Sequence, residues 1–432
     1  MATRIPQLRW GLLAMVMFTG SLYRETGLEA WAIGEEPPPS LMFPLNQIQN
    51  NGRPIAVILL VGGAMMVVLG KHSYSPMPSW VAALIAVQGI LVLKLFLSTL
   101  VTYGLLSLVV YVLSYILFGI GVPSWIKEDG NSTWAFRSLG IAAAIFALAN
   151  LAQAVVDPAP LLHGGRFRGT TGNAQHAGLL LALSTVILAY LVSTPTRRRL
   201  ERIFWLGALI ATSILLIWTG SRTAALMVFV SLLILFRKRL NFLAVFATAG
   251  ALAIGFILYQ ASGIVELEFV GMIKADKLTR LDDTRSLAWL SMWNGFMDYP
   301  IFGVPQDPSY GRLGFGENAW LAMACSCGVL GLLPLLMLGA CILHSISRLK
   351  LDSLAYKDIP NGRDAIVAGL SALLVGSIFE ATFLGVITYN VPFLYVAMAI
   401  ADHFIATHAI ARVKFYRRAI DDQMAAVARR KS

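Results

Sequence analysis

The chain of 432 residues is 57% apolar and 13% charged, with a mean hydropathy of +0.70, whereas a typical soluble domain is about 45–50% apolar and about 25% charged. This composition excludes a soluble enzyme and a protein with a single membrane anchor. The net charge of +11 does not indicate a nucleic-acid-binding protein, because the Lys and Arg residues alternate between loops instead of gathering on one polar domain.

Long apolar stretches separated by short polar breaks run through the chain. Since one membrane-spanning helix needs about 20 apolar residues, this pattern predicts about twelve spans and an all-α integral membrane protein. The predicted spans cover residues 10–23, 54–70, 79–98, 100–122, 134–156, 174–193, 203–219, 222–236, 240–260, 318–345, 365–382 and 386–407. The expected parts are therefore nine helices in 1–260, a loop subdomain in 261–317, three helices in 318–407 and a basic tail in 408–432.

The first apolar stretch allows two interpretations. Arg4 and Arg9 precede it, as in a secretory signal that would be cleaved near Ala30-Trp31-Ala32. About a dozen residues separate the stretch from that motif, and this distance is longer than a cleavage region normally allows. We therefore expect a membrane helix here.

The distribution of positive charge predicts the orientation. With the amino terminus inside, most of the 34 Lys and Arg residues fall in the inner loops and in the tail from Arg412 to Lys431, as the positive-inside rule requires. The tail is expected to bind anionic lipid, with binding of a cytoplasmic partner as the alternative. The two long polar segments, 24–53 and 261–317, then lie outside, so the functional site is expected to face the periplasm.

Lys94 is predicted near the outer end of the third span, where it either snorkels to the interface or reaches an anionic headgroup. A Gly-rich turn from Gly169 to Gly178 leads into the sixth span, preceded by two cations, and its free backbone N–H groups offer an anion cradle or form a plain flexible turn. The candidate binding residues here are Arg166, Arg168, Asn173, Gln175 and His176.

His176 has no second His or Cys at ligand spacing on the outer face, so it is expected to be a polar residue that starts a helix instead of a metal ligand. Arg222 stands in the short hairpin Thr219 to Thr223 between two spans. An arginine there is costly unless it meets water, a carboxylate or a phosphate. A snorkelling or orienting charge would suit the inside better, so we expect Arg222 to be functional.

The segment 261–317 is too long for a simple connector and is expected to fold on the membrane surface. Asp282-Asp283-Thr284 predicts a helix start, apolar residues from Trp289 to Phe296 recur at helical spacing, and Asp298-Tyr299-Pro300 predicts the end. The aromatic residues of this helix are expected to pack on lipid or the bundle, with sugar stacking as the alternative. The segment also contains Arg280, Arg285 and Arg312, and Arg285 lies in the first turn of this helix.

Two acidic residues lie toward the outside. Glu317 precedes the tenth span, and Glu380 at the outer end of the eleventh span is expected to pair with one of the arginines. The three cysteines, Cys325, Cys327 and Cys341, share one apolar stretch and predict neither a disulfide framework nor a metal site.

Four of these elements resemble the bacterial O-antigen ligase and polymerase superfamily. They are the Gly172–Gly178 turn, the Thr219-Gly220-Ser221-Arg222 hairpin, the helix from Arg285 with Asp298-Tyr299-Pro300-Ile301-Phe302-Gly303 after it, and the segment at Glu317. Ligases of this superfamily show His, then Asn, Ser or Gln, nine residues, Gly, two residues and Gly. Here Asn318, Gly328 and Gly331 keep that spacing, while Glu317 stands in the place of the histidine.

The resemblance covers roughly residues 130–400 and implies a GT-C-like helical membrane glycosyltransferase that uses undecaprenyl-diphosphate-linked glycans. Arg222 and Arg285 would clamp the diphosphate, so that no metal or other cofactor is required. The lesser candidates for this role are Arg166, Arg168, Arg280, Arg312 and Lys94. Glu317 would accept the acceptor's proton or pair with an arginine, and Asn318 would orient substrate or begin the tenth helix. Gly328 and Gly331 would allow close helix packing.

The reaction expected from this resemblance is transfer of a glycan at the periplasmic face of the bacterial inner membrane. The acceptor is the next lipid-linked repeat unit if the protein is an O-antigen or exopolysaccharide polymerase, and a lipid A-core sugar if it is a ligase. A third reading is a transporter or flippase of lipid-linked glycan, which predicts ionisable residues near the bilayer midplane in related halves of the chain.

Overall fold

The computed structural model describes residues 5–22, 41–70, 77–97, 101–130, 132–163, 165–194, 198–237, 285–305, 317–353, 362–383 and 388–407. These residues form a multi-pass, all-α membrane protein with a single short β hairpin among them. Within the described residues, nine helices are long and apolar enough to cross a membrane, and one shorter apolar helix accompanies them. The predicted span 240–260 lies outside the described residues.

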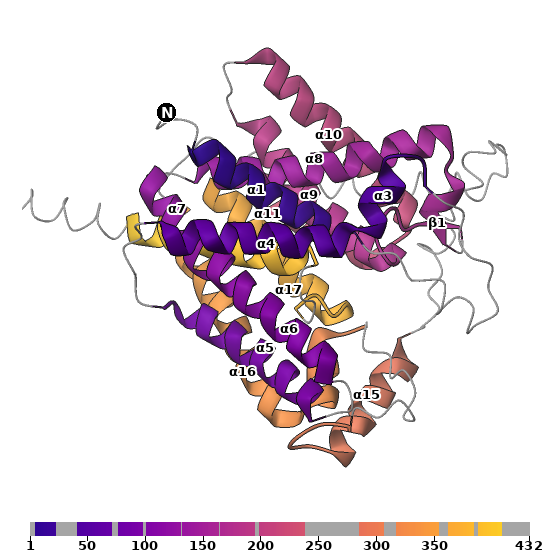
Figure 1. Ribbon diagram of the computed structural model, residues 1–432, viewed down its shortest axis with the longest axis vertical. Helices are drawn as coiled ribbons and strands as arrows, with labels where there is room; N and C mark the ends of the chain where they lie inside the picture. Colours follow the sequence, from indigo (N-terminus) through magenta and orange to yellow (C-terminus); the bar gives the residue numbers. More distant parts are fainter. Residues whose placement is uncertain are drawn as a thin grey trace, which may run out of the picture.

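The order of the elements follows the predicted spans closely (Figure 1). The helices of the first half are α1 (Ile5–Gly20), α3 (Leu45–Asn50), α4 (Gly52–Leu69), α5 (Ser79–Phe96), α6 (Val101–Ser114), the π-helix η1 (Tyr115–Gly121), α7 (Val122–Asp129) and α8 (Thr133–Val156). The second half contains η2 (Ala159–Leu161), β1 (Leu162–His163), β2 (Arg166–Phe167), α9 (Ala174–Ser193), α10 (Arg199–Thr219), α11 (Arg222–Phe236), α15 (Ser286–Asp298), α16 (Ala319–Ser353), α17 (Gly362–Phe379) and the helix Asn390–Thr407.

Three helices differ most from the predicted spans. The first helix begins at Ile5 instead of residue 10 and ends at Gly20, because Arg9 can join it by pairing with Glu128 and Asp129 at the end of α7. The fourth apolar stretch continues as helix to Asp129 instead of stopping near residue 122. The tenth helix continues to Ser353 and is broken at Gly328, where φ is 63° and ψ is −158°.

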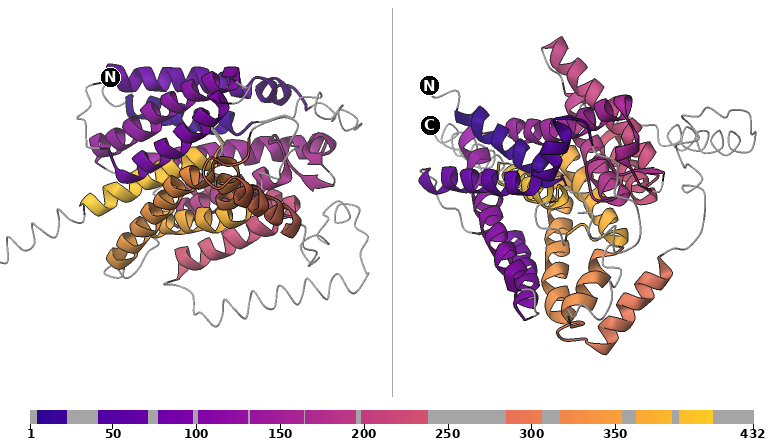
Figure 2. Two further views of the ribbon diagram at one scale, coloured as in Figure 1. Left: turned by 90° about the horizontal axis from the view of Figure 1, so that it is seen from below. Right: turned by 45° about the vertical axis from the view of Figure 1, so that its right-hand side comes forward.

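Two helices form the centre of the bundle. Every residue of α9 from Ala177 to Ala189 is buried, and so is every residue from Tyr389 to Ala401 at the start of the last helix. A helix that is apolar on all sides belongs in the interior. Helix α9 packs against α8, α10, α11 and α17. In the left view of Figure 2, the indigo and purple helices of the first half form a layer above the orange and yellow helices of the second half.

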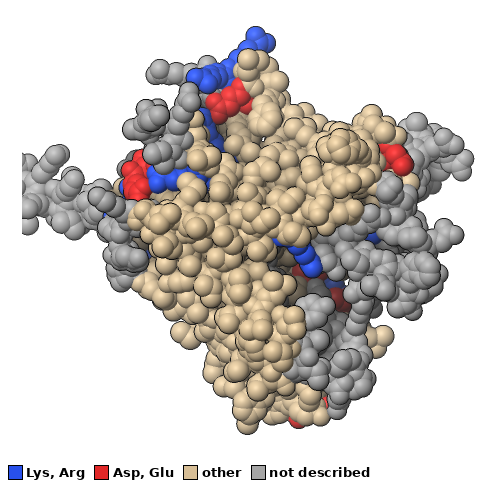
Figure 3. Space-filling model, viewed as in Figure 1, with Lys and Arg blue, Asp and Glu red and all other residues tan. Residues whose placement is uncertain are grey.

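The outer helices turn apolar side chains outward. On α10, Ile210, Ile214 and Ile217 are 53%, 43% and 57% exposed, and their spacing places them on one face of the helix. Figure 3 shows a broad face without charged side chains, with Lys, Arg, Asp and Glu toward its edges and in a hollow at the centre right. A surface of this kind is unfavourable in water and suits lipid.

Ion pairs between helices gather at one end of the bundle. Arg137 of α8 pairs with Glu201 of α10, and Arg237 after α11 pairs with Asp364 of α17. The indole Nε1 of Trp80 at the start of α5 donates to Asp402 near the end of the last helix. We call this the opposite end, because the predicted site residues lie at the other end, which we call the site end. In Figure 1 the opposite end is at the left, near α7, and the site end is at the right, near α3 and β1.

Candidate functional site

The site end is organised by the loop between α8 and α9. The backbone of Thr170 in this loop makes two buried contacts. Thr170 N donates to Asn150 Oδ1 at 2.9 Å, and Thr170 O accepts from Gln49 Nε2 at 3.1 Å. Gly169 adopts φ 59° and lies against the side chains of Asn150 and Phe167. The Gly-rich turn therefore packs against side chains of α3, α8 and β2, while its use as an anion cradle stays a prediction.

The turn brings β2 to the neighbouring hairpin. Arg166 Nε donates to Thr219 O at 2.8 Å. A Cβ added at Gly178 of α9 would lie 2.9 Å from Ser221 Cβ, so this glycine allows the hairpin to approach α9 closely. Ser221 Oγ accepts from Ala224 N and caps α11. Arg222 follows directly and is exposed at the first position of α11.

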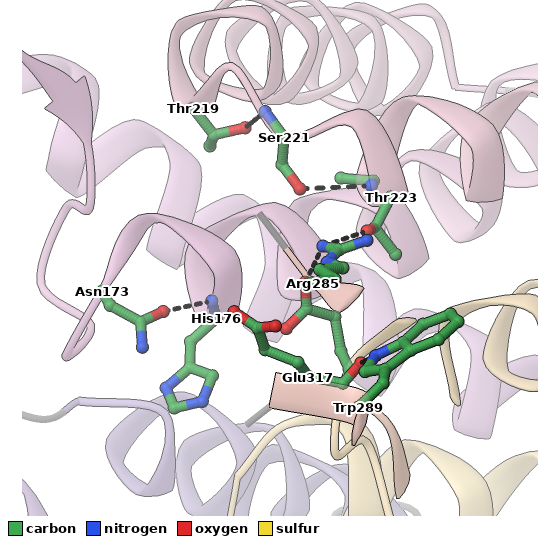
Figure 4. A network of polar contacts seen from close by, with 10 residues as sticks. Asn173, His176, Thr219, Ser221, Thr223, Arg285, Trp289 and Glu317 are labelled. Atoms are coloured by element: carbon green, nitrogen blue, oxygen red, sulfur yellow. Dashed lines mark hydrogen bonds and ion pairs between the residues drawn. The ribbon is translucent and has the colours of Figure 1, made fainter. Parts of the chain in front are cut away.

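Arg285 is held beside this hairpin from the other side of the site. Its Nη2 donates to Thr223 Oγ1 at 3.1 Å and to Glu380 Oε1 at 2.9 Å. Its guanidinium carbon also lies 5.4 Å from the centre of the Phe379 ring. The expected pairing of Glu380 with an arginine is thus confirmed, and the arginine is Arg285 (Figure 4).

Glu317 approaches the same group from the segment before α16. Figure 4 shows Glu317 and Trp289 below Arg285, the hairpin residues Thr219, Ser221 and Thr223 above it, and Asn173 and His176 to its left. Trp289 Nε1 donates to Glu317 O at 3.1 Å. The carboxylate atom Glu317 Oε2 is buried without a hydrogen-bond partner among the described residues.

The charged groups of the site act on one another. Burial lowers the pKa of Arg166, and Arg222 and Arg285 lower it further while Glu380 opposes them. Burial raises the pKa of Glu380 to about 8, against the effect of Arg285. Glu317 raises the pKa of Glu380 as well. Arg166, Arg222 and Arg285 therefore form one cluster with the two carboxyl groups, which we call the arginine cluster.

Several other candidates have different surroundings. Asn173 Oδ1 accepts from His176 N and caps α9, as expected for a helix start, and the His176 side chain is exposed. Asn318 Oδ1 accepts from the N–H groups of Trp320 and Leu321, so Asn318 begins α16.

Gln175 is partly buried and Arg168 is buried. Arg280 and Arg312, and the predicted helix start at Asp282-Asp283-Thr284, lie outside the described residues.

Lys94 contacts backbone carbonyl groups in the structure, and the two expectations for it at the membrane interface stay predictions. Its Nζ donates to Phe302 O at 2.6 Å and to Gly303 O at 3.2 Å, which fixes the loop after α15 to the end of α5. Gly328 also differs from the expectation of helix-on-helix packing, since a Cβ there would lie 2.2 Å from Ile301 O of the same loop. Both residues position α15.

The expected aromatic residues of α15 divide between its two faces. Met292 is buried, Trp289 and Phe296 are partly buried, and Trp293 is exposed. The Trp289 ring lies 6.3 Å from the Phe379 ring, so this aromatic contact joins α15 to the bundle. The face of α15 opposite to Arg285 lines a separate cavity of about 400 Å³, with Leu290, Asn294 and Asp298 among its lining residues.

Thr223 and the carbonyl of Thr219 are the site groups that the sequence does not single out. Both lie in the hairpin whose arginine is predictable, but a threonine contact and a backbone acceptor leave no separate pattern. Among the described residues no group of three or more His, Cys, Asp or Glu side chains could hold a metal ion. Comparison of the chain with models of known protein families and with curated protein sequences gives no match.

Proposed function

We propose that the protein is a glycosyltransferase of the bacterial inner membrane that moves a glycan from undecaprenyl diphosphate to a sugar hydroxyl at the periplasmic face. The observation that carries this proposal is the arginine cluster. Arg166, Arg222 and Arg285 come from three separate segments and lie at one end of an apolar bundle, where Arg285 pairs with Glu380 and Arg222 and Arg285 both act on Arg166. Both chain ends would face the cytoplasm, in agreement with the distribution of positive charge.

Three cationic side chains at the edge of a lipid-facing bundle suit a lipid-linked diphosphate. Guanidinium groups bind phosphate oxygens through paired hydrogen bonds. They also neutralise the charge that develops on the diphosphate as it leaves, and such electrostatic stabilisation is usually a large part of catalysis. The clamp residues would be Arg222 and Arg285, with Arg166 beside them, and no metal cofactor is needed for this role.

The reaction requires one proton transfer. The acceptor oxygen forms a bond to the anomeric carbon, the bond from that carbon to the diphosphate oxygen breaks, and the diphosphate leaves with the electron pair. The proton of the acceptor hydroxyl goes to Glu317, whose unpartnered Oε2 suits this role. A positioned base of this kind contributes about 10²–10⁴-fold.

The first choice of acceptor is the next lipid-linked repeat unit, which makes the protein an O-antigen or exopolysaccharide polymerase. This choice rests on Glu317, because the resembling ligases carry histidine in its place. The alternative is a ligase that transfers the finished glycan to a lipid A-core sugar. The clamp and the leaving group are the same in both reactions, so only the acceptor distinguishes them.

A transporter or flippase of lipid-linked glycan is the lesser alternative. It would need ionisable groups along a path through the membrane. The ionised pairs of the described residues lie instead at the two ends of the helices, with Arg285 and Glu380 at the site end and Arg237 and Asp364 at the opposite end. We therefore favour the enzyme.

The test incubates the purified full-length protein with undecaprenyl-diphosphate-linked repeat units, with and without a lipid A-core acceptor. Glycan ladders without core support the polymerase, and product that appears only with core supports the ligase. Arg222→Ala or Arg285→Ala should reduce product formation by at least about 10²-fold, because each removes a charged contact to the leaving group.

Arg199→Ala is the matched control, since Arg199 is exposed at the opposite end of the bundle. It should leave product formation unchanged. Full product formation by Arg285→Ala would contradict the clamp, and absence of product with both acceptors would contradict the enzyme. Movement of intact lipid-linked glycan across vesicle bilayers, without product, would identify the transporter instead.

A further inference from the structure

Glu380 is the most deeply placed charged group of the site. Its side chain is 3% exposed, while the Arg285 side chain is 24% exposed. It follows the last residue of α17, and Glu380 N donates to Gly376 O at 2.9 Å, which continues the helical hydrogen bonding. A carboxyl group fixed in this way directs its oxygen atoms at the guanidinium from the protein interior.

The Arg285 Nη2 atom has two N–H groups, and both donate hydrogen bonds in the structure. One donates to Glu380 and the other to Thr223. A diphosphate oxygen that bonds to this nitrogen must therefore replace one of the two partners. The hydroxyl of Thr223 carries no charge, whereas an ionised Glu380 would both compete for the nitrogen and repel the phosphate.

The charged groups around Glu380 come from every part of the arginine cluster. Arg285 precedes α15, Glu317 precedes α16 and Arg166 belongs to β2, while Thr223 of α11 supplies a hydroxyl. Addition of a diphosphate to two ionised carboxylates would leave the site with surplus negative charge. Loss of one carboxylate charge relieves this repulsion, and Glu380 is the carboxyl group in direct contact with the arginine.

We propose that Glu380 is a positioning residue that holds Arg285 in place before substrate binds and then yields the guanidinium to the diphosphate, becoming a neutral carboxylic acid as it does so. This inference rests on the proposed function, because it takes the diphosphate as the ligand of Arg285. Where Glu380 is ionised before binding, one proton moves from solvent to Glu380 when the diphosphate binds, and it returns to solvent when the diphosphate leaves.

The burial of Glu380 favours its neutral form, which the proposed exchange of Glu380 for the diphosphate requires. Burial raises the pKa of Glu380 to about 8, so the neutral form predominates below that pH and the carboxylate above it. Diphosphate affinity should therefore be high below pH 8 and fall as the pH rises beyond it. Because one proton is linked to binding, Kd should rise by up to about tenfold per pH unit above pH 8.

The experiment is calorimetric titration of the full-length protein in detergent with inorganic diphosphate between pH 6.5 and 9.5, in metal-free buffers of different ionisation enthalpy. Above pH 8 the wild-type protein should take up protons in excess of those that the free ligand binds. Glu380→Gln should abolish this excess uptake and flatten the pH dependence of Kd, because the amide is neutral at every pH.

Asp364→Asn is the matched control. Asp364 is likewise a buried carboxylate paired with an arginine, but it lies at the opposite end of the bundle. This variant should keep the wild-type proton uptake. Equal proton uptake by the wild type and Glu380→Gln would overturn the inference while leaving the proposed function intact.

Two further outcomes also decide the question. If Glu380→Gln does not fold, the wild-type measurement still serves, since absence of excess proton uptake above pH 8 overturns the inference. If neither the wild type nor Glu380→Gln binds diphosphate at any pH, both the inference and the proposed function are contradicted.

Discussion

The Arg285 side chain makes contacts with two helices that are far from it in the chain. Thr223 belongs to the first turn of α11, and Glu380 and Phe379 lie at the end of α17. A guanidinium held by a hydroxyl, a carboxylate and a ring has little freedom to rotate. The site therefore presents a pre-oriented cation, which lowers the entropy cost of placing a substrate.

Glu317 differs from Glu380 in that one of its carboxylate oxygens lacks a hydrogen-bond partner among the described residues. If it accepts the proton of the acceptor hydroxyl, Glu317→Gln should lower the turnover number by about 10²–10⁴-fold with little change in donor binding. Glu317→His should retain part of the activity, because imidazole can accept the same proton. Turnover of lipid-linked repeat units measures both variants.

Unchanged turnover by Glu317→Gln would exclude a proton-accepting role and leave a structural one. The neighbouring Asn318 provides no useful control, since it caps α16. Ser291→Ala is suitable, because Ser291 is exposed on α15 and its replacement should leave turnover unchanged.

At the scale of elements, α15 depends on the break in α16. Val304 N donates to Cys325 O at 2.8 Å and Val329 N donates to Pro300 O at 2.8 Å. The loop after α15 thus satisfies backbone groups that the break at Gly328 releases from the helix. Lys94 Nζ donates to two carbonyl groups of the same loop.

This arrangement makes Gly328 a sensitive position. Its φ of 63° favours glycine, and a Cβ would lie 2.2 Å from Ile301 O. Gly328→Ala should therefore displace the loop and with it Arg285, lowering glycan transfer by at least about tenfold and the melting temperature by several degrees, at a cost of about 1–3 kcal/mol for such strain.

Thermal unfolding in detergent and the transfer assay measure these effects. Gly207→Ala is the control, because Gly207 lies in α10 and nothing surrounds the position that its Cβ would occupy. Alanine there should be neutral or slightly stabilising. A Gly328→Ala protein with wild-type melting and activity would show that α15 does not depend on the break.

The apolar helices were predictable because the membrane imposes a length and a composition on each span. Backbone contacts are not predictable in this way. Lys94 binds carbonyl groups that every residue possesses, and the break at Gly328 depends on a loop that follows another helix. The pairing of Glu380 with an arginine was predictable because a lone carboxylate near the membrane needs a cation, but the sequence left open which arginine it is.

The whole molecule has two chemically distinct ends. The opposite end joins its helices through Arg137, Arg237 and their carboxylate partners, whereas the site end carries the arginine cluster. If the site faces the periplasm, a cysteine introduced at Asn50 should react with a membrane-impermeant maleimide in intact cells whose outer membrane has been made permeable. A cysteine at Arg199 should react only after the inner membrane is opened.

Both positions are exposed in the structure, and the three natural cysteines would first be replaced by alanine. Labelling is read as a mass shift on a gel. The reverse pattern, with Arg199→Cys labelled in intact cells, would contradict the proposed orientation and place the site in the cytoplasm.

The order of the site residues along the chain determines when the arginine cluster is complete during synthesis of the protein. Arg166 and Arg222 emerge from the ribosome well before α15, and the carboxyl group of Glu380 follows only after α17 is complete. A nascent chain halted before this helix would lack the carboxyl group that pairs with Arg285. Under the proposed function, the lipid-linked diphosphate would therefore find a complete binding site only after the final helices have entered the bilayer.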